Sequence, residues 1–467
     1  MKSNDKYRNL MRLGLSVIAL LIMVTVWAVF WLRFYAEDIL VPFYMRGNLL
    51  LFFIYGVLQA LFNSFYGGYR IGYYKRENVI YSACLALVLC NCVTYLQICL
   101  IGYSIMNPLP IIFMSTLQGI VIFAWTLFAH ACYMKAFPPR KMLLVYGGEK
   151  LADDLLRKMK AYPERFDIHE AIRIDEGFEK IRKKAREYES VVLCDIPSAK
   201  RNRLLKLCLE GGIRTYITPK ISDIVMRGSV EIDLFDTPLL LSRNTGLNFE
   251  QRILKRITDI VFAALGLLLL SPLMLLICAA IKLYDGGRII YSQKRLTENG
   301  REFLLFKFRS MIEEAEENGA QLSTMKDKRI TPVGRLIRSV RLDELPQLWN
   351  VIKGEMSIVG PRPERPEIAE KQMRELPEFR YRLKARAGLT GLAQVTGRYD
   401  TTAYDKLRMD LMYIMGYSLL GDFKLMLMTL KTLFMKNSSQ GVADTRGDLP
   451  LKDYKPASES PETGQAL

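Results

Sequence analysis

The stretch Arg338–Arg365, RSVRLDELPQLWNVIKGEMSIVGPRPER, combines two adjacent carboxylates with a helix start and a basic loop fixed by prolines. Asp343 is placed to cap the run ELPQLWNVIKG, because its carboxylate can accept from free backbone N–H groups and Pro346 is tolerated in a first turn. The helix is expected to end at Gly354 and to bury one face, which carries Leu345, Leu348, Trp349 and Ile352.

The two carboxylates of this stretch, Asp343 and Glu344, would lie at the positive end of the helix dipole, which predicts that both are ionised. Arg362 stands between two prolines, and its planar guanidinium group suits bidentate phosphate contacts. Carboxylates beside guanidinium groups suit a divalent cation and a phosphorylated substrate. The pair alone also allows a plainer alternative, in which Asp343 is only a helix cap and Arg362 only part of a surface turn.

The pattern around the pair is more specific than the pair itself. The run LDELPQLWNVIKGEMSIVGPRP resembles that of the bacterial sugar transferases, the monotopic phosphoglycosyl transferases. Matching runs follow in family order: KFRSM at 307–311, DKRITPVGRLIR at 327–338 and AGLTGLAQVTGR at 387–398. The resemblance implies transfer of a hexose 1-phosphate from a UDP-sugar, glucose or galactose on family precedent, to undecaprenyl phosphate with release of UMP. Such a step begins exopolysaccharide, capsule or O-antigen synthesis.

The resemblance also implies roles for individual residues. Asp343 would be the nucleophile that carries a covalent phosphosugar, and Glu344 its partner, with Mg²⁺ held by both carboxylates against the diphosphate. An ionised carboxylate can attack phosphorus when a metal and arginines screen the repulsion. Val340 and Arg341 replace the usual Thr-Ser pair of the family. Candidates for binding phosphate, each of which could instead be a solvated charge, are Lys307, Arg309, Arg335, Arg338, Arg362 and Arg398.

Composition points to a membrane and to anionic partners. Half of the 467 residues are hydrophobic, and 65 Lys and Arg against 48 Asp and Glu give a net charge of +17. This charge suits anionic lipid head groups and pyrophosphates, whereas no nucleic-acid motif accompanies it. The eight cysteines show neither a disulfide framework nor a zinc spacing, which favours a reducing compartment. With only His130 and His169 present, histidine acid–base chemistry is disfavoured.

Four apolar segments, near 13–32, 49–65, 79–103 and 109–134, each approach the ~20 residues that cross a bilayer. They predict a four-helix transmembrane bundle over 1–140. Basic residues before the first segment, between the second and third and after the fourth place both the N-terminus and the later domains in the cytoplasm. The protein would then be a multi-pass protein of the bacterial inner membrane, without a removable signal peptide. The segments lack Asp, Glu, Lys and Arg, which disfavours a transporter, although such a bundle could serve a homo-oligomer.

Residues 141–250 alternate short apolar strands with charged helices, as in MLLVYGG, LADDLLRKMK, VVLCDI, NRLLKLCLEGG and TYITP. This pattern predicts a Rossmann-like cytoplasmic βαβ module. Gly147 and Gly148 follow the first strand as in a dinucleotide turn, but the G-x-G-x-x-G spacing is absent. A structural or regulatory module is therefore favoured over a nucleotide site. Long members of the resembled family also place a membrane bundle and such a module before the transferase part.

The expected α-rich monotopic catalytic domain, 251–441, opens with a charge-free run at 260–281 that is long enough to span a bilayer. Basic residues flank both ends, so the positive-inside rule cannot orient it. Pro272 removes the helical bond to Leu268, and the Ser271 hydroxyl can satisfy a freed backbone group. We therefore predict a re-entrant membrane helix over 254–283, broken at Ser271 and Pro272. A Pro-kinked spanning helix is the alternative, but it would place Asp343 outside the cell.

The end of the chain carries two weaker patterns. Residues 419–436 form an apolar run with few charges, which suits either a helix in the membrane interface or a core helix. Residues 442–467, rich in Pro, Ser and Glu, are expected to be a disordered tail. Two other function classes remain open, a membrane nucleotide-sugar sensor without turnover and a transporter built on the first four helices. The presence of both Asp343 and Glu344 argues against the sensor.

Overall fold

The computed structural model describes residues 5–39, 42–242, 246–312, 327, 329–397, 401–433 and 451. The chain divides into two compact units, Met1–Thr218 with Thr445–Leu467, and Pro219–Asp444. The sequence predicted that the cytoplasmic module ends at 250. The division between the two compact units falls earlier, between Thr218 and Pro219, and a domain boundary at 250 stays a prediction. The tail expected at 442–467 lies outside the described residues except for Leu451, whose backbone N–H donates to Asp153 at 2.9 Å.

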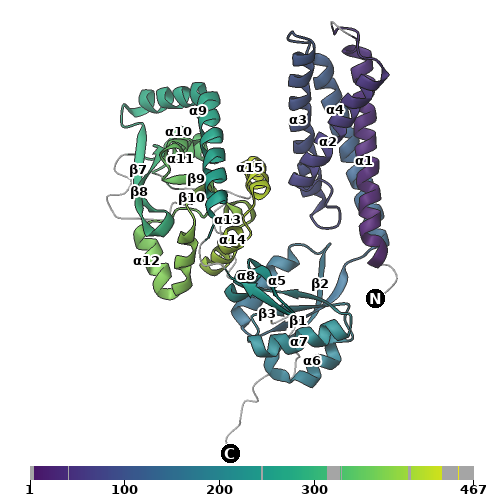
Figure 1. Cartoon of the computed structure of the whole chain (residues 1–467), viewed down its shortest axis with the longest axis vertical. Helices are drawn as coiled ribbons and strands as arrows, with labels where there is room; N and C mark the ends of the chain where they lie inside the picture. Colours follow the sequence, from purple (N-terminus) through teal and green to yellow (C-terminus); the bar gives the residue numbers. More distant parts are fainter. Residues whose placement is uncertain are drawn as a thin grey trace, which may run out of the picture. The chain divides into compact units, whose positions relative to one another are not determined.

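The first unit begins with long apolar helices that lie side by side in Figure 1: α1 (Asp5–Phe34), α2 (Met45–Tyr66), α3 (Arg76–Ile101) and α4 (Leu109–Ala136). Trp27, Trp31 and Tyr55 are buried in their common core. The outer faces are apolar as well, with Phe53 and Leu96 more than half exposed. A helix that is apolar all round suits a lipid environment better than water. Each of these helices is long and apolar enough to cross a membrane.

Amide side chains join these helices at their centre. Asn91 of α3 accepts from the Tyr55 hydroxyl of α2 at 3.1 Å and donates to Gln118 of α4 at 3.0 Å. Gln118 in turn donates to the backbone oxygen of Met23 in α1 at 3.1 Å. Buried polar groups are retained where they are hydrogen-bonded. This network therefore fixes the rotation of each helix against the others, which apolar contacts alone specify poorly.

The module that follows is a parallel sheet in the order β2-β1-β3-β4, with helices between successive strands. The predicted alternation of strands and helices over 141–217 is confirmed. The chain forms β1 (Arg140–Tyr146), α5 (Glu149–Lys160), β2 (Phe166–Arg173), α6 (Phe178–Ala185), β3 (Ser190–Cys194), α7 (Ser198–Glu210) and β4 (Arg214–Ile217). The central strands β1 and β3 are almost wholly buried, as their continuous apolar sequences require.

The glycine turn after β1 packs against the end of β3. A Cβ on Gly147 would lie 2.2 Å from the backbone oxygen of Asp195, and one on Gly148 would lie 2.7 Å from the Asp195 carboxylate. Glycine is thus needed for the close approach of two loops of the protein itself. An aspartate also lies in front of this turn, and the role of the module as structural or regulatory stays a prediction.

The second unit contains small sheets and helices that pack around several clusters of buried hydrophobic side chains. Its elements are α8 (Ile221–Arg227), β5 (Val230–Leu234), β6 (Thr237–Leu241), α9 (Phe249–Asp285), β7 (Ile290–Leu296), β8 (Glu302–Phe308), α10 (Pro332–Ser339), α11 (Gln347–Lys353), β9 (Met356–Val359), α12 (Pro366–Glu375), β10 (Ala387–Thr390), α13 (Leu392–Thr396), α14 (Ala403–Met415) and α15 (Leu419–Leu433). Strands β5 and β6 pair antiparallel, as do β7 and β8, whereas β9 and β10 are parallel. Buried residues of β8, β9, α11 and α14 share the core, which therefore lies directly beneath α11.

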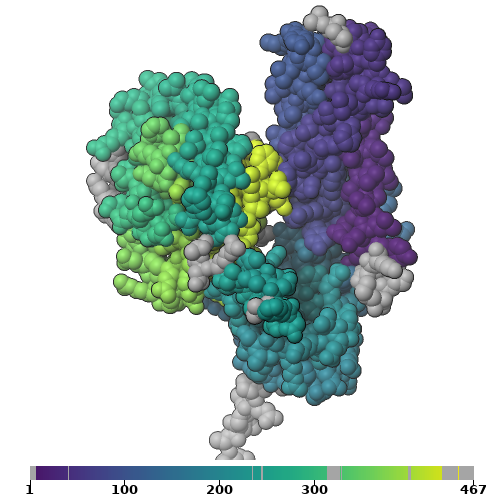
Figure 2. Space-filling model, viewed as in Figure 1, coloured from purple at the N-terminus to yellow at the C-terminus, as the bar shows by residue number. Residues whose placement is uncertain are grey.

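Helix α9 is one helix with Pro272 inside it, and Figure 1 shows it sharply bent into two arms. The first arm buries Ala263 in the core that also contains Leu348 of α11. The second arm packs Ile277 and Ile281 against Phe308 and Ile337. Both arms therefore belong to the same unit. Much of the helix stays on the surface of this unit in Figure 2, with exposed apolar side chains on either side of Pro272: Leu268, Leu269, Leu275 and Leu276.

Buried polar groups hold the first arm of α9 in place. Lys255 and Asp422 of α15 form an ion pair at 2.7 Å, with both side chains less than a tenth exposed. Asp259 accepts from the Ser357 hydroxyl and from the backbone N–H of Ile358 in β9, each at 3.0 Å. Burial of a charge is costly unless it is paired, so these contacts specify one position for the arm. The sequence places charges here on an apolar helix, and the structure shows that they face inward.

Candidate active site

The carboxylate pair lies in a short 3-10 turn, Leu342–Glu344, and not at the start of the next helix. The expectation that Asp343 caps the helix is wrong, because α11 begins only at Gln347 with Pro346 before it. The expected end at Gly354 is confirmed, with φ at 87°. The expectation that Trp349 is buried is wrong, since its side chain is 52% exposed.

Cationic side chains from separate elements surround the pair. Lys307 of β8 places Nζ 3.2 Å from Oε1 of Glu344, and Arg362, from the loop after β9, places Nη2 3.1 Å from the same oxygen. Asp343 is buried, with 8% of its surface exposed. Across the described ranges no hydrogen bond reaches its carboxylate. Glu344 is thus held by cations, whereas Asp343 is left without a hydrogen-bonding partner beside it.

The two carboxyl groups differ in acidity because their surroundings differ. Burial, together with the charge of Glu344, raises the pKa of Asp343 to about 6, although Lys307 and Arg338 oppose the change. Burial would also raise the pKa of Glu344, but Lys307, Arg362 and Arg341 outweigh it and hold this pKa below its usual range. Both groups are ionised at neutral pH as expected. The cause is the neighbouring cations and not the dipole of α11.

A small cavity adjoins the pair and is lined by Arg295, Lys307, Glu344, Gln347 and Arg362, among others. Gln347 is 3% exposed, and its Nε2 has no hydrogen-bond partner among the residues that the structure describes. Burial and the charges of Arg365 and Arg362 lower the pKa of Arg295 to about 10. A buried donor without a partner beside packed cations indicates a site for an anion. Sequence reasoning missed Gln347, although it follows Glu344 at helical spacing, and missed Arg295, for which β7 offers no motif.

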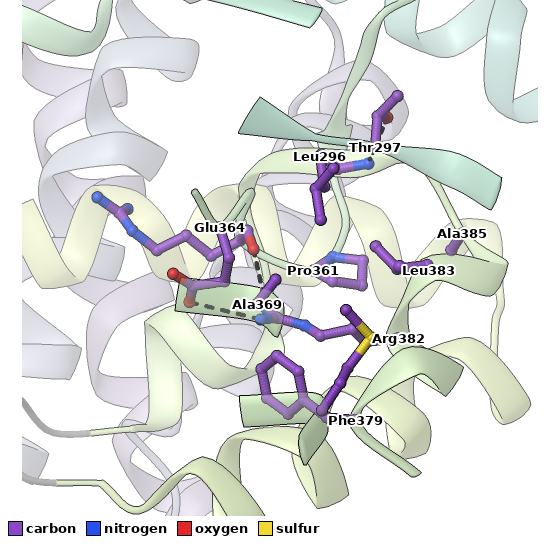
Figure 3. A pocket seen from close by; sticks show the side chains of 12 residues that line it. Leu296, Thr297, Pro361, Glu364, Ala369, Phe379, Arg382, Leu383 and Ala385 are labelled. Atoms are coloured by element: carbon purple, nitrogen blue, oxygen red, sulfur yellow. Dashed lines mark hydrogen bonds and ion pairs between the residues drawn. The ribbon is translucent and has the colours of Figure 1, made fainter. Parts of the chain in front are cut away.

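Arg382 holds the loop that carries Arg362, and Figure 3 shows the Arg382 side chain directed toward Glu364 of this loop. Arg382 donates from Nη2 to the backbone oxygen of Arg362 at 2.8 Å and from Nη1 to Glu364 at 3.4 Å. The same guanidinium group pairs with the buried Asp410 of α14 at 3.0 Å. Burial raises the pKa of Asp410 to about 6. Arg382 therefore ties the loop to α14, and the sequence alone did not indicate this contact.

The remaining predicted phosphate-binding residues are placed as follows. Arg338, in the last turn of α10, lies close enough to Asp343 to lower the pKa of that carboxyl group. Arg309 is buried and pairs with Asp285 at the end of α9. Arg335 is exposed on α10. Arg398 lies outside the described residues. A role in binding phosphate stays a prediction for each of these four arginines.

Asp343 and Glu344 alone do not complete the coordination of a divalent cation, so oxygens of the substrate would have to supply the remaining ligands. No cluster of three or more His, Cys, Asp or Glu side chains suited to a metal occurs within the described part of the chain. Asp343, without a hydrogen-bond partner, fits one metal–oxygen bond, and Glu344 can offer the oxygen that the cations leave. Mg²⁺ is commonly held by one or two carboxylates together with substrate phosphates. The residues present therefore fit such an ion.

Comparison with known proteins covers the second unit. A family model described as bacterial sugar transferase matches residues 250–436. The exopolysaccharide production protein ExoY of Rhizobium meliloti is 38% identical over 202 residues, which are 40% of this chain and 87% of that protein. The residues that the family model matches include the carboxylate pair, the loop with Arg362 and helix α9 from its second residue.

Longer relatives are matched over part of their length. A UDP-N-acetylgalactosamine-undecaprenyl-phosphate N-acetylgalactosaminephosphotransferase of Aeromonas hydrophila is 38% identical, over 50% of this chain and 55% of its own. A UDP-glucose:undecaprenyl-phosphate glucose-1-phosphate transferase of Escherichia coli is 37% identical, over 46% of each chain. The chain thus spans about half the length of these relatives.

Proposed function

Because the chain belongs to the bacterial sugar transferase family, we propose that it transfers a hexose 1-phosphate from a UDP-sugar to undecaprenyl phosphate and releases UMP. One observation carries the proposal. Asp343 is a buried carboxylate without a hydrogen-bond partner in the described part of the chain, next to a Glu344 that two cations hold. A protein that only senses a nucleotide sugar needs neither a buried carboxylate of this kind nor two carboxyl groups with pKa values shifted in opposite directions. An enzymatic function therefore explains the site better than a sensor function does. The product would begin exopolysaccharide, capsule or O-antigen synthesis.

The reaction is proposed as two displacements at one phosphorus atom. A carboxylate oxygen of Asp343 attacks the phosphorus that bears the sugar, and the bond from this phosphorus to the bridging oxygen breaks, so UMP leaves with that oxygen. A phosphate oxygen of undecaprenyl phosphate then attacks the same phosphorus. The bond to Asp343 breaks, which frees the carboxylate and forms the undecaprenyl diphosphate sugar. The lipid phosphate is already an anion and needs no strong base.

The surrounding cations have separate tasks in this scheme. Lys307 and Arg362 hold Glu344 and can also face the equatorial oxygens of the transferred phosphoryl group. Gln347 offers its unpartnered amide to the anion in the adjoining cavity. Mg²⁺, held by Asp343 and Glu344, would supply charge neutralisation for the diphosphate when bound. The chain's own part is to keep Asp343 ionised and Glu344 in position.

The proposed location is the bacterial inner membrane, with the active site at its cytoplasmic face. Helices α1–α4 would cross the bilayer as a bundle, and α9 would enter and leave on one side. The re-entrant course is supported by both arms of α9 packing within one unit and by the exposed leucines on either side of Pro272. A water-soluble UDP-sugar and a lipid phosphate can meet at a site held in this way.

The deciding experiment is incubation of the purified full-length protein with a UDP-sugar and Mg²⁺ but no lipid. We expect up to one UMP released per enzyme and a mass gain of one hexose phosphate on the peptide that contains Asp343. Asp343→Asn should show neither, whereas Asp405→Asn, in the first turn of α14 and paired with Arg408, should behave as the wild type. A panel of UDP-glucose, UDP-galactose and UDP-N-acetylgalactosamine identifies the sugar.

Steady-state kinetics provide a second test of the double-displacement mechanism. Double displacement predicts parallel double-reciprocal lines when both substrates are varied. Intersecting lines, together with no adduct on the Asp343 peptide, would show direct transfer in a ternary complex and would leave Asp343 as a metal ligand only.

A further inference from the structure

The first unit encloses a cavity of about 380 Å³ where the ends of helices α1–α4 meet the parallel sheet. Its walls come from the first turns of α1, the loop between α2 and α3, the end of α4 and the amino-terminal ends of β1, β2 and β4. One carboxylate, Glu164, lines it. The cationic residues of the wall are all arginines: Arg8, Arg12, Arg140, Arg165 and Arg214.

Aromatic rings and backbone oxygens hold several of these arginines. The Arg165 guanidinium lies 4.1 Å from the centre of the Tyr73 ring, and that of Arg12 lies 5.0 Å from the same ring. Arg8 donates to the backbone oxygen of Pro138 at 2.9 Å. Stacked guanidinium groups are restrained without being neutralised, because a ring carries no net charge. The cavity wall therefore presents at least two ring-restrained guanidinium groups, those of Arg12 and Arg165.

The loop that carries Tyr73 is shaped for this arrangement. Gly72 has a φ of 72°, and a Cβ there would lie 2.1 Å from the ring of Tyr133 on α4. Only glycine therefore allows the loop to lie against α4 and present Tyr73 to both arginines.

The single acidic residue of the wall is already engaged. Glu164 contacts the Nε2 atom of His130 at 3.1 Å, and that histidine lies near the end of α4. The guanidinium groups of Arg12 and Arg165 share the Tyr73 ring, so their like charges repel one another, and a bound anion relieves this repulsion. Guanidinium groups bind carboxylate and phosphate oxygens through two parallel hydrogen bonds, and a phosphate offers oxygens to more than one arginine at once. The ligand class is therefore a phosphate.

We propose that this cavity binds the phosphate of an anionic membrane lipid. The inference rests on the proposed membrane position of α1–α4, since only then do the helix ends that form the wall lie at the depth of the head groups. Basic pockets on the cytoplasmic side of membrane helices favour anionic lipids. The bound lipid would fix the parallel sheet against the helices. Soluble phosphate compounds carry the same phosphate group, so the experiment compares a lipid phosphate with soluble phosphates as ligands of the cavity.

The test is native mass spectrometry of the full-length protein, freed of lipid in a neutral detergent and without UDP-sugar. Added phosphatidylglycerol should be retained as one bound molecule, whereas phosphatidylcholine should not. Arg12→Gln and Arg165→Gln should each weaken retention about tenfold, as the loss of one charge-assisted bond predicts. Arg165→Lys should keep most of it. The matched control is Arg76→Gln, at the same end of α3 but outside the cavity wall.

Circular dichroism and gel filtration establish that each variant is folded. Glycerol 3-phosphate and inorganic phosphate form the soluble arm. Binding of either one as tight as that of phosphatidylglycerol would assign the cavity to a soluble ligand and overturn the lipid proposal. Retention of phosphatidylglycerol unchanged in both glutamine variants would overturn the site itself. Transferase activity does not enter these readouts, so failure of the proposed reaction leaves the test intact.

Discussion

The Ser271 hydroxyl donates a hydrogen bond to the backbone oxygen of Leu268 at 2.8 Å, directly before the proline of α9. Leu268 precedes Pro272 by four residues, so its oxygen is the acceptor that the proline deprives of a helical N–H. The side chain thus supplies the missing donor at a position where both neighbouring residues are expected to contact lipid. An unsatisfied carbonyl in the hydrocarbon core of a bilayer costs several kcal/mol.

Replacing this proline should straighten α9. Pro272→Ala restores the bond to Leu268 and removes the steric cause of the bend, which pulls Ile277 and Ile281 away from Phe308. We expect a lower rate of UMP release and a lower Tm. Single-cysteine labelling at Lys282, in a background without other reactive thiols, should be cytoplasmic in the parent protein. Labelling of the parent from the outer side would contradict the re-entrant course.

Arg382 should act on transfer through Arg362, whose backbone oxygen it holds. Arg382→Gln should lower kcat/KM by about 10- to 100-fold, since a displaced transition-state donor costs about 10²-fold or more. Arg374→Gln, on the exposed face of α12, is the matched control. The double variant Arg362→Gln/Arg382→Gln should be no slower than Arg362→Gln alone. Additive losses would show that Arg382 acts independently.

Local patterns predicted local structure well. The alternation over 141–217 and the helix end at Gly354 depend on short-range preferences and were confirmed. Lys307 and Arg362, taken from motifs, do meet at Glu344. The strand–helix alternation and the helix end share one cause, because each depends on residues that are neighbours in sequence. Lys307 and Arg362 reach Glu344 from other elements, and only their place in the resembled family's motifs had singled them out.

Contacts between distant segments were not predictable in the same way. The cap expected at Asp343 was wrong because Arg341 adopts a left-handed conformation, with φ at 55°, and a separate turn follows it. Arg382 reaches Arg362 only through the packing of its segment on α14, and Arg295 reaches the cavity only through the pairing of β7 with β8. No pattern within one segment records such pairings.

The second unit should catalyse transfer alone, provided that α8 is kept. Ile224 of α8 is buried with Phe379, Leu407 and Leu411, and Gly228 lies against Met415. A protein that starts at Pro219 should therefore release UMP, whereas one that starts at 248 should have a lower Tm. Ile224→Ala in the full-length chain should lower the free energy of unfolding by about 2–5 kcal/mol, the usual cost of truncating a buried isoleucine to alanine. Equal Tm values for both truncated proteins would refute the role of α8.

As pH rises, ionisation of Asp343 should lower the stability of the folded protein, whereas ionisation of Glu344 should raise it. The pKa of Asp343 is about 6 in the folded protein, against 3.8 in the unfolded chain, so its ionisation favours unfolding as pH rises from 4 to 6. Asp343→Asn should then raise the free energy of unfolding over the wild type by up to about 3 kcal/mol at pH 7 and by little at pH 4, with a corresponding rise in Tm at pH 7. Glu344→Gln should lose stability at pH 7, because the lowered pKa of Glu344 stabilises the folded state above pH 4. The measurement is thermal unfolding in EDTA.

Mg²⁺ should reverse the destabilisation at Asp343 without any turnover. A cation at the pair favours the ionised carboxylate, so millimolar Mg²⁺ together with UDP should raise the Tm of the wild type at pH 7, since UDP supplies the phosphate oxygens that complete the coordination. Asp343→Asn should show a much smaller rise, and Asp405→Asn should respond as the wild type does. The rise should shrink below pH 6, where Asp343 takes up a proton that competes with the metal. An equal rise in Asp343→Asn would place the metal elsewhere.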